Sequence, residues 1–405
     1  MNENEPELSG YRWIVLLIFM FANITMQMLW ISYASITKVQ APAYYGVGED
    51  MILLFSLVFM IAYIPMTLIA SWVIDNYSFK WGAGIGAMLA GVFGFLRFIA
   101  GTNYTLALSF QIGIAIGQPF LLNSITKLSG NWFPDSERTT ATGLSLISQF
   151  IGILLGMFIS PFLVINNDLT PMLLVYGTLA LLSGTLFIIF VKDKPPIPPS
   201  EQATVEKVFN FKGIKDLLTN KYFLILSILF FIGLGSFNMI TSYVDLIFQP
   251  RGYTAEESGI IGAIMLLGGI VGSIVMAALS DKFQKRKLLI IISVSITTLS
   301  LGILTFAASE LLVFLFSFLL GFGILSAGPV SLEYAVEITT PVPEASSNGI
   351  LMMVGQVGGI IFIVGLIDLT LPNGDYFPAL LLLTILSVLL LIASVFLKER
   401  DNFNN

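Results

Sequence analysis

The chain has 405 residues, of which 56% are hydrophobic and only 11% charged, and its mean hydropathy is +0.90. In soluble domains roughly a quarter of the residues are charged, so this composition predicts an integral membrane protein instead. The formal net charge of −6 says little about partners, because in membrane proteins the placement of Lys and Arg matters more than their sum.

Two residue types are missing from the sequence. The chain has no Cys, which excludes disulfides and thiolate metal sites, and no His, which removes the usual metal ligand and near-neutral proton switch. We therefore expect no metal, no cofactor and no enzyme activity, and any proton coupling would have to use carboxylates. A phosphate-binding GxxxxGK[ST] motif and a nucleic-acid-binding signature are also missing, so neither ATP-driven transport nor a nucleic-acid partner is expected.

The spans can be predicted along the chain. Residues 1–9, MNENEPELS, are acidic rather than basic, so no removable signal peptide is expected. A bilayer crossing needs about 20 apolar residues, and twelve segments qualify, centred near residues 24, 62, 90, 115, 150, 180, 233, 267, 296, 323, 356 and 386. Residues 193–220, rich in Pro and charge, predict a linker with an amphipathic surface helix. The predicted fold is an all-α membrane protein with twelve transmembrane helices in two six-helix halves, residues 1–192 and 221–405.

The basic residues predict the orientation of these spans. If both termini are cytoplasmic, sixteen Lys and Arg residues face the cytoplasm and three face outward, namely Lys38, Arg97 and Arg251. Cytoplasmic loops carry the excess of positive charge in membrane proteins. We therefore expect a multi-pass protein of the plasma or inner cell membrane with both ends inside, and for Arg97 a side chain that reaches the outer surface.

The two halves contain an internal repeat. The segments SWVID and AALSD end at positions that differ by 281 − 75 = 206, and the two glutamines of the matching fifth and eleventh spans differ by 356 − 149 = 207. A shift of 207 residues also takes a tryptophan of the first span onto an aromatic residue of the seventh. The three pairs are Asp75 and Asp281, Gln149 and Gln356, and Trp30 and Phe237. Parallel repeats with a site between the halves are typical of the major facilitator fold.

The first span contains an unusual polar patch, ITMQMLWISYASI at residues 24–36. Because unsatisfied polar groups are costly in hydrocarbon, we expect this patch to face protein or a cavity. Trp30 lies 17 residues after Trp13, or about 25 Å along a helix, and is either a site residue or a packing residue; we favour the site. Gln149 and Gln356 are likewise either site residues or partners in hydrogen bonds between helices, and their symmetry favours the site.

Three segments resemble one transporter family. The run SLEYAVEITTPVPEASSNGILMMVGQVGGI resembles the helix 10–11 signature of the feline leukaemia virus subgroup C receptor-related transporters. The runs APAYYGVGEDMILLFSLVFMIAYIP and KLSGNWFPDSERTTATGLSLISQFIG are similar to their helix 1–2 and helix 4–5 segments. The likeness covers most of the membrane portion, whereas the linker and the last span carry little of it.

The resemblance implies a substrate class. Members of that family move choline and ethanolamine, have been discussed as haem exporters, and include a relative linked to pyridoxine. The implied site is a cage of aromatic and glutamine side chains for a choline-like cation, formed here by Trp30, Gln149, Phe237 and Gln356. At the position that matches Phe237 the animal transporters resemble one another in having a Tyr. Because Phe lacks the hydroxyl, the substrate of this protein can differ from theirs.

Charged residues near the predicted inner face suggest a gate. Asp75 and Asp281 match the facilitator loop motif, of which only the second copy keeps a dense basic run, DKFQKRK. We expect each carboxylate to cap the N-terminus of a helix in the opposite half. Glu333 and Glu337 lie four residues apart and share a helix face. They are interpreted as gate residues paired with Lys127 or Arg138, with proton coupling as the alternative.

One further carboxylate, Asp245, lies eight residues after Phe237. It could attract cations or take part in coupling, and a plain salt bridge with Arg251 is the alternative.

Together these observations predict a monomeric carrier that transports a small organic cation by alternating access, with the lipid bilayer and the small-molecule substrate as its partners. Two alternatives remain open at this stage. One is a proton-coupled exporter of a larger amphipathic, drug-like, haem-like or vitamin compound, and the other is a receptor or sensor that does not transport. The retained aspartates and the symmetric candidate site argue against the sensor.

Overall fold

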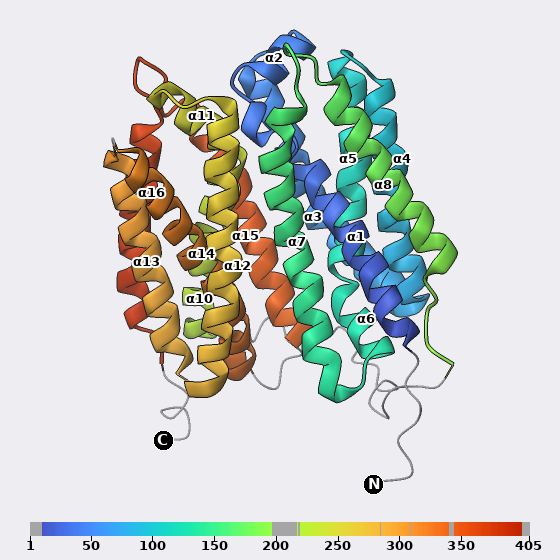
Figure 1. The fold of residues 1–405 in the computed structure, drawn as a ribbon. Helices are drawn as coiled ribbons and strands as arrows, with labels where there is room; N and C mark the ends of the chain where they lie inside the picture. The colour runs from blue at the N-terminus through green and yellow to red at the C-terminus, as the bar shows by residue number, and fades with distance from the viewer. Residues whose placement is uncertain are drawn as a thin grey trace. The chain divides into compact units, whose positions relative to one another are not determined.

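In the computed structural model the described part of the chain consists mainly of long helices, most of which are joined by short connections (Figure 1). The structure describes residues 10–196, 217, 219–283, 285–307, 309–339 and 344–398, and at a few of these positions only the backbone is described. The contacts divide the chain into two compact units, Met1–Glu206 and Lys207–Asn405.

The N-terminal unit contains six long helices. They are α1 (Tyr11–Ile31), α3 (Glu49–Asn76), α4 (Phe79–Ile99), α5 (Tyr104–Leu122), α7 (Asp135–Leu163) and α8 (Thr170–Phe190). Between them lie three short helices that the sequence analysis did not predict, η1 (Ala34–Ile36), α2 (Gln40–Tyr45) and α6 (Ile125–Trp132). The span near residue 24 is therefore interrupted after Ile31 and continues as a short 3₁₀ helix.

The C-terminal unit also contains six long helices. They are α10 (Lys221–Ser242), α12 (Ala255–Phe283), α13 (Arg286–Phe306), α14 (Glu310–Thr339), α15 (Glu344–Gly365) and α16 (Phe377–Val395), with the short α11 (Val244–Phe248) and η3 (Gln249–Arg251) after α10. Within the described residues, twelve helices are long and apolar enough to cross a membrane. Each contains one of the predicted span centres, so the prediction of twelve spans is confirmed.

The two units pack their helices in corresponding pairs. In the N-terminal unit the main contacts join α1 to α7, α3 to α5, α4 to α5 and α4 to α8. In the C-terminal unit they join α10 to α15, α12 to α14, α13 to α14 and α13 to α16. Each pair holds the same place in the order of spans within its own unit, so the repeat in the sequence is also a repeat of packing.

Glycines allow the backbones of α1 and α7, and likewise those of α10 and α15, to approach each other closely. A Cβ atom at Gly152 of α7 would collide with the carbonyl oxygen of Ile24 in α1, and one at Gly358 of α15 would collide with the carbonyl oxygen of Phe231 in α10. The positions differ by 358 − 152 = 206 and 231 − 24 = 207, which are the offsets of the sequence repeat. Small residues allow helix backbones to approach closely in membranes, and here they hold together the helices that carry the candidate site residues.

The predicted linker, residues 193–220, lies mostly outside the described residues. Near its end, the Asn220 side chain accepts hydrogen bonds from the backbone N–H groups of Tyr222 (3.0 Å) and Phe223 (3.3 Å). This is an N-cap, which satisfies donors that lack a partner within the first turn of a helix. The start of α10 is therefore determined locally by the sequence NKYF.

Candidate functional site

Most polar side chains of the patch in the first span form hydrogen bonds within the N-terminal unit. The Ser35 hydroxyl donates to the carbonyl of Met157 in α7 (2.9 Å), and the Gln27 side-chain oxygen accepts from Gln118 of α5 (3.3 Å). Trp30 is different, because it is buried but its indole N–H has no hydrogen-bond partner among the described residues. The patch faces protein as expected, and within it Trp30 retains an unused donor.

Gln149 lies on the helix that packs against Trp30's helix. It is half-buried on α7, one residue after Ser148. The Asn23 amide of α1 donates to the carbonyl of Ser145 and to the Ser148 hydroxyl, both at 3.1 Å, which holds the two helices together one turn before Gln149. Trp30 and Gln149 therefore stand on two helices that are in direct contact.

The C-terminal unit repeats this arrangement on α10 and α15. Phe237 is 4% exposed on α10, and Gln356 is half-buried on α15. The Asn238 amide donates to the side-chain oxygen of Gln356 (3.1 Å). Asn238 was missed by the sequence analysis, although a polar residue next to Phe237 in an apolar span was a usable signal. Its hydrogen bond orients the Gln356 amide.

The two glutamates of α14 share one cation. Arg286 of α13, which is 8% exposed, donates from Nε to Glu337 (2.7 Å) and lies 3.5 Å from Glu333 through Nη2. Its Nη1 donates to the Ser280 hydroxyl (3.1 Å). The prediction that the glutamates share a helix face agrees with this geometry. Arg286 is a partner that the sequence analysis did not name, because only the packing of α13 against α14 brings it there.

Three predicted gate residues are described only by their backbone. Asp75 lies in the last turn of α3, Asp281 in the last turn of α12, and Arg138 in the first turn of α7. Their side chains lie outside the described part of the structure, so the predicted capping of helices in the opposite half stays a prediction.

Asp245 is fully buried at the start of α11, where its carboxylate accepts a hydrogen bond from the Gln249 amide (2.7 Å). Arg251 forms its salt bridge with Asp375 (3.1 Å) and also donates to the carbonyl of Leu304 (2.7 Å). The expected alternative partner of Asp245 is thus engaged elsewhere.

The prediction for Arg97 was wrong. Its side chain does not reach the surface but is 0% exposed, and Nη1 donates to the Gln111 side-chain oxygen (2.6 Å) and to the carbonyl of Leu29 (3.3 Å). A polar acceptor on the neighbouring α5 holds the guanidinium inside the unit. Counting charges by loop could not reveal that acceptor.

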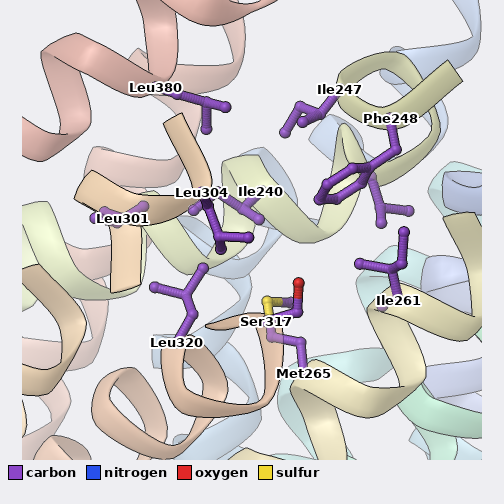
Figure 2. A pocket seen from close by; sticks show the side chains of 12 residues that line it. Ile240, Ile247, Phe248, Ile261, Met265, Leu301, Leu304, Ser317, Leu320 and Leu380 are labelled. Carbon is purple, nitrogen blue, oxygen red and sulfur yellow. The ribbon is translucent and has the colours of Figure 1, made fainter. Parts of the chain in front are cut away.

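One small pocket lies inside the C-terminal unit. Figure 2 shows its lining, which is apolar except for the Ser317 hydroxyl and draws on α10, α11, α12, α13, α14 and α16. Its volume is about 20 Å³, close to what one water molecule needs. None of the four candidate site residues lines this pocket, so it is not the predicted site.

Comparisons with known proteins agree with this architecture. The family profile of the Major Facilitator Superfamily matches residues 13–363. Solute carrier family 49 member A3 of Xenopus tropicalis is 32% identical over 385 residues, which span 91% of this chain and 80% of that protein. The choline/ethanolamine transporter FLVCR1 of Felis catus is 30% identical over 398 residues, spanning 92% and 70% of the two chains.

Solved structures of distant transporters share the fold. A bacterial homologue of the human lysosomal transporter Spinster aligns with a TM-score of 0.70 at 14% identity, over 96% of this chain and 95% of that chain. The nucleoside transporter NupG aligns with a TM-score of 0.73 at 14% identity, over 95% and 99%. Twelve apolar spans, a packing repeat and these relatives lead to one conclusion: the chain belongs to the major facilitator superfamily, and within it to the FLVCR-like transporters.

Proposed function

We propose that this protein is a carrier of a small organic cation such as choline or ethanolamine, and that it works by alternating access. The observation that carries the proposal is the repeated pairing of one aromatic and one glutamine side chain on matching helix pairs. Trp30 and Gln149 stand on α1 and α7, and Phe237 and Gln356 stand on α10 and α15. Relatives named as choline/ethanolamine transporters support the same substrate class.

These four side chains suit a quaternary ammonium ion. Aromatic faces attract such cations through their quadrupole, by up to about 2 kcal/mol each when water is excluded. Amide oxygens add partial negative charge without the desolvation cost of a full anion. The unused indole N–H of Trp30 can donate to a hydroxyl of the substrate, and Phe237 offers only its ring. We therefore propose cation–π attraction as the main recognition term.

Flux across a membrane tests the proposal. Purified protein in proteoliposomes should exchange external radiolabelled choline for unlabelled choline loaded inside, and unlabelled ethanolamine should compete. Vesicles without protein are the control. If choline neither exchanges nor binds in isothermal titration, the cation proposal is wrong for this protein. If choline binds without any flux, the protein is a sensor and not a carrier.

Choline affinity is expected to be nearly independent of pH between 6 and 8. The proposed site contains two aromatic rings and two amides, none of which titrates in this range, and the charge of choline is fixed. Isothermal titration at pH 6, 7 and 8 in buffers of matched ionic strength measures this. A tenfold change in dissociation constant across this range would indicate that a carboxylate takes part in binding.

A gate at the inner face is the second part of the proposal. Asp281→Asn should shift the population between inward-open and outward-open states without abolishing choline binding, because it removes a charge that would cap a helix. The chain has no Cys, so single cysteines introduced near the end of α12 and near the start of α7, the helix that Asp281 is expected to cap, can report accessibility by maleimide labelling. Unchanged labelling rates in Asp281→Asn would contradict the gating role.

A further inference from the structure

Arg97 is a fully buried cation inside a membrane-spanning unit. It lies in the last turn of α4, and its Nε and Nη2 atoms have no hydrogen-bond partner among the described residues. No described carboxylate forms a salt bridge with it, and its neutral partner is Gln111 (2.6 Å). A charge inside a membrane is expensive and usually functional. The burial of this charge therefore points to a specific role for Arg97.

The contacts of Arg97 and Gln111 converge on the end of α1. Arg97 Nη1 and Gln111 Nε2 each donate to the carbonyl of Leu29 at 3.3 Å, and Gln111 Nε2 also donates to the carbonyl of Phe55 in α3 (3.1 Å). Leu29 lies in the last turn of α1, which ends at Ile31. Carbonyls there lack partners within the helix, and the helix dipole places partial negative charge at this end. The pair thus caps the interrupted helix with a positive charge.

The same guanidinium also contacts the segment that follows the interruption. Its central carbon lies 5.1 Å from the centroid of the Tyr33 ring, and the Tyr33 hydroxyl is hydrogen-bonded to that of Tyr45 in α2 (2.8 Å). Burial raises the pKa of Tyr45 well above its ordinary value, so its hydroxyl stays neutral in this bond. Arg97 therefore holds residues on both sides of Trp30, at Leu29 and at Tyr33.

We propose that Arg97, together with Gln111, is a positioning residue that sets the orientation of Trp30 by holding α1 on both sides of its interruption. The inference rests on the proposed function only in taking Trp30 to be a substrate-binding residue. A planar guanidinium is needed for the task, because it lies over the Tyr33 ring while its Nη1 donates both to Gln111 and to the Leu29 carbonyl. The single ammonium of a lysine keeps the charge but cannot reproduce this geometry.

The test uses a signal from Trp30 itself. The chain has five tryptophans, and protein labelled with 5-fluorotryptophan should give five ¹⁹F resonances, with that of Trp30 assigned by its loss in Trp30→Phe. Arg97→Lys should move the Trp30 resonance by more than its linewidth and leave the other four in place. Arg251→Lys is the matched control, because it makes the same substitution in the C-terminal unit and should leave the Trp30 resonance unmoved. Gln111→Leu should reproduce the effect of Arg97→Lys, and it decides the question if Arg97→Lys fails to fold.

Transport gives a second readout. In proteoliposomes Arg97→Lys should raise the KM for choline about fivefold or more with little change in kcat, since displaced site residues weaken binding steeply. An unmoved Trp30 resonance in both variants would overturn the positioning role, whether or not the KM for choline changes. If wild type ignores choline, the proposed substrate is wrong, yet the movement of the resonance still establishes the positioning role.

Discussion

Trp30→Ala is expected to weaken choline binding by about 1–2 kcal/mol, or roughly five- to thirtyfold in dissociation constant. The variant removes the ring face that the proposed site offers from α1, together with an indole N–H that has no partner among the described residues. Trp30→Phe should lose less, because it keeps an aromatic face and loses only the donor and some ring area. Isothermal titration or tracer binding of choline to purified protein measures both effects.

A control is needed because Trp30 is buried and its truncation leaves a cavity, which costs about 3–5 kcal/mol of stability for large aromatic residues. Trp132→Ala is a suitable match, because Trp132 is also buried in the N-terminal unit and its indole N–H has no partner among the described residues, but it lies on α6. It should bind choline as wild type does. If wild type binds choline and a folded Trp30→Ala binds it equally well, the family assignment stands and Trp30 is not part of the site.

Gly358→Ala is expected to destabilise the C-terminal unit. The added methyl group would collide with the Phe231 carbonyl, so α10 and α15 would have to move apart. Overpacking of this kind costs about 1–3 kcal/mol. The separation should also stretch the Asn238–Gln356 hydrogen bond of 3.1 Å and so weaken choline binding. Thermal unfolding of the protein in detergent measures the first effect, and titration with choline measures the second.

Gly349→Ala is the matched control on the same helix. Gly349 is exposed, and a Cβ atom there would meet nothing within 4 Å. In an exposed helix interior alanine is more favourable than glycine by up to about 1 kcal/mol, so Gly349→Ala should be neutral or slightly stabilising. Equal unfolding temperatures for the two variants would show that α10 and α15 do not approach each other closely at Gly358.

Much of the candidate site could be named from the sequence, and the repeat was the reason. A single Gln in an apolar span is ambiguous, but the separation of Gln149 and Gln356, 356 − 149 = 207, differs by one residue from that of Asp75 and Asp281, 281 − 75 = 206. The structure adds that the matching helices pack in matching pairs within each unit. It also adds Asn238. This residue has no polar counterpart in the repeat, since the position 207 residues earlier is the apolar Ile31. The repeat could not identify this residue, and its hydrogen bond with Gln356 does.

The sequence by itself determined the number of spans and their approximate centres, and it predicted the division into halves. Each of these depends on local properties: the length of an apolar run, the presence of Pro and charge in a linker, and a recurring spacing. Lipid and packed protein are both apolar, so hydropathy finds a span wherever it lies in the bundle. For the same reason it cannot say which face of a span meets lipid and which meets another helix.

Only the tertiary structure decided which polar groups meet. Arg97, expected at the outer surface, is enclosed because α5 brings Gln111 and α1 brings the Leu29 carbonyl to it. Glu337 contacts Arg286 because α13 packs against α14. The Leu29 carbonyl in the last turn of α1 likewise finds its donors on other helices, Arg97 on α4 and Gln111 on α5. Such partners come from distant parts of the chain. A hydrogen bond forms only when donor and acceptor lie within about 3 Å of each other, and only the packing of the helices brings these groups so close.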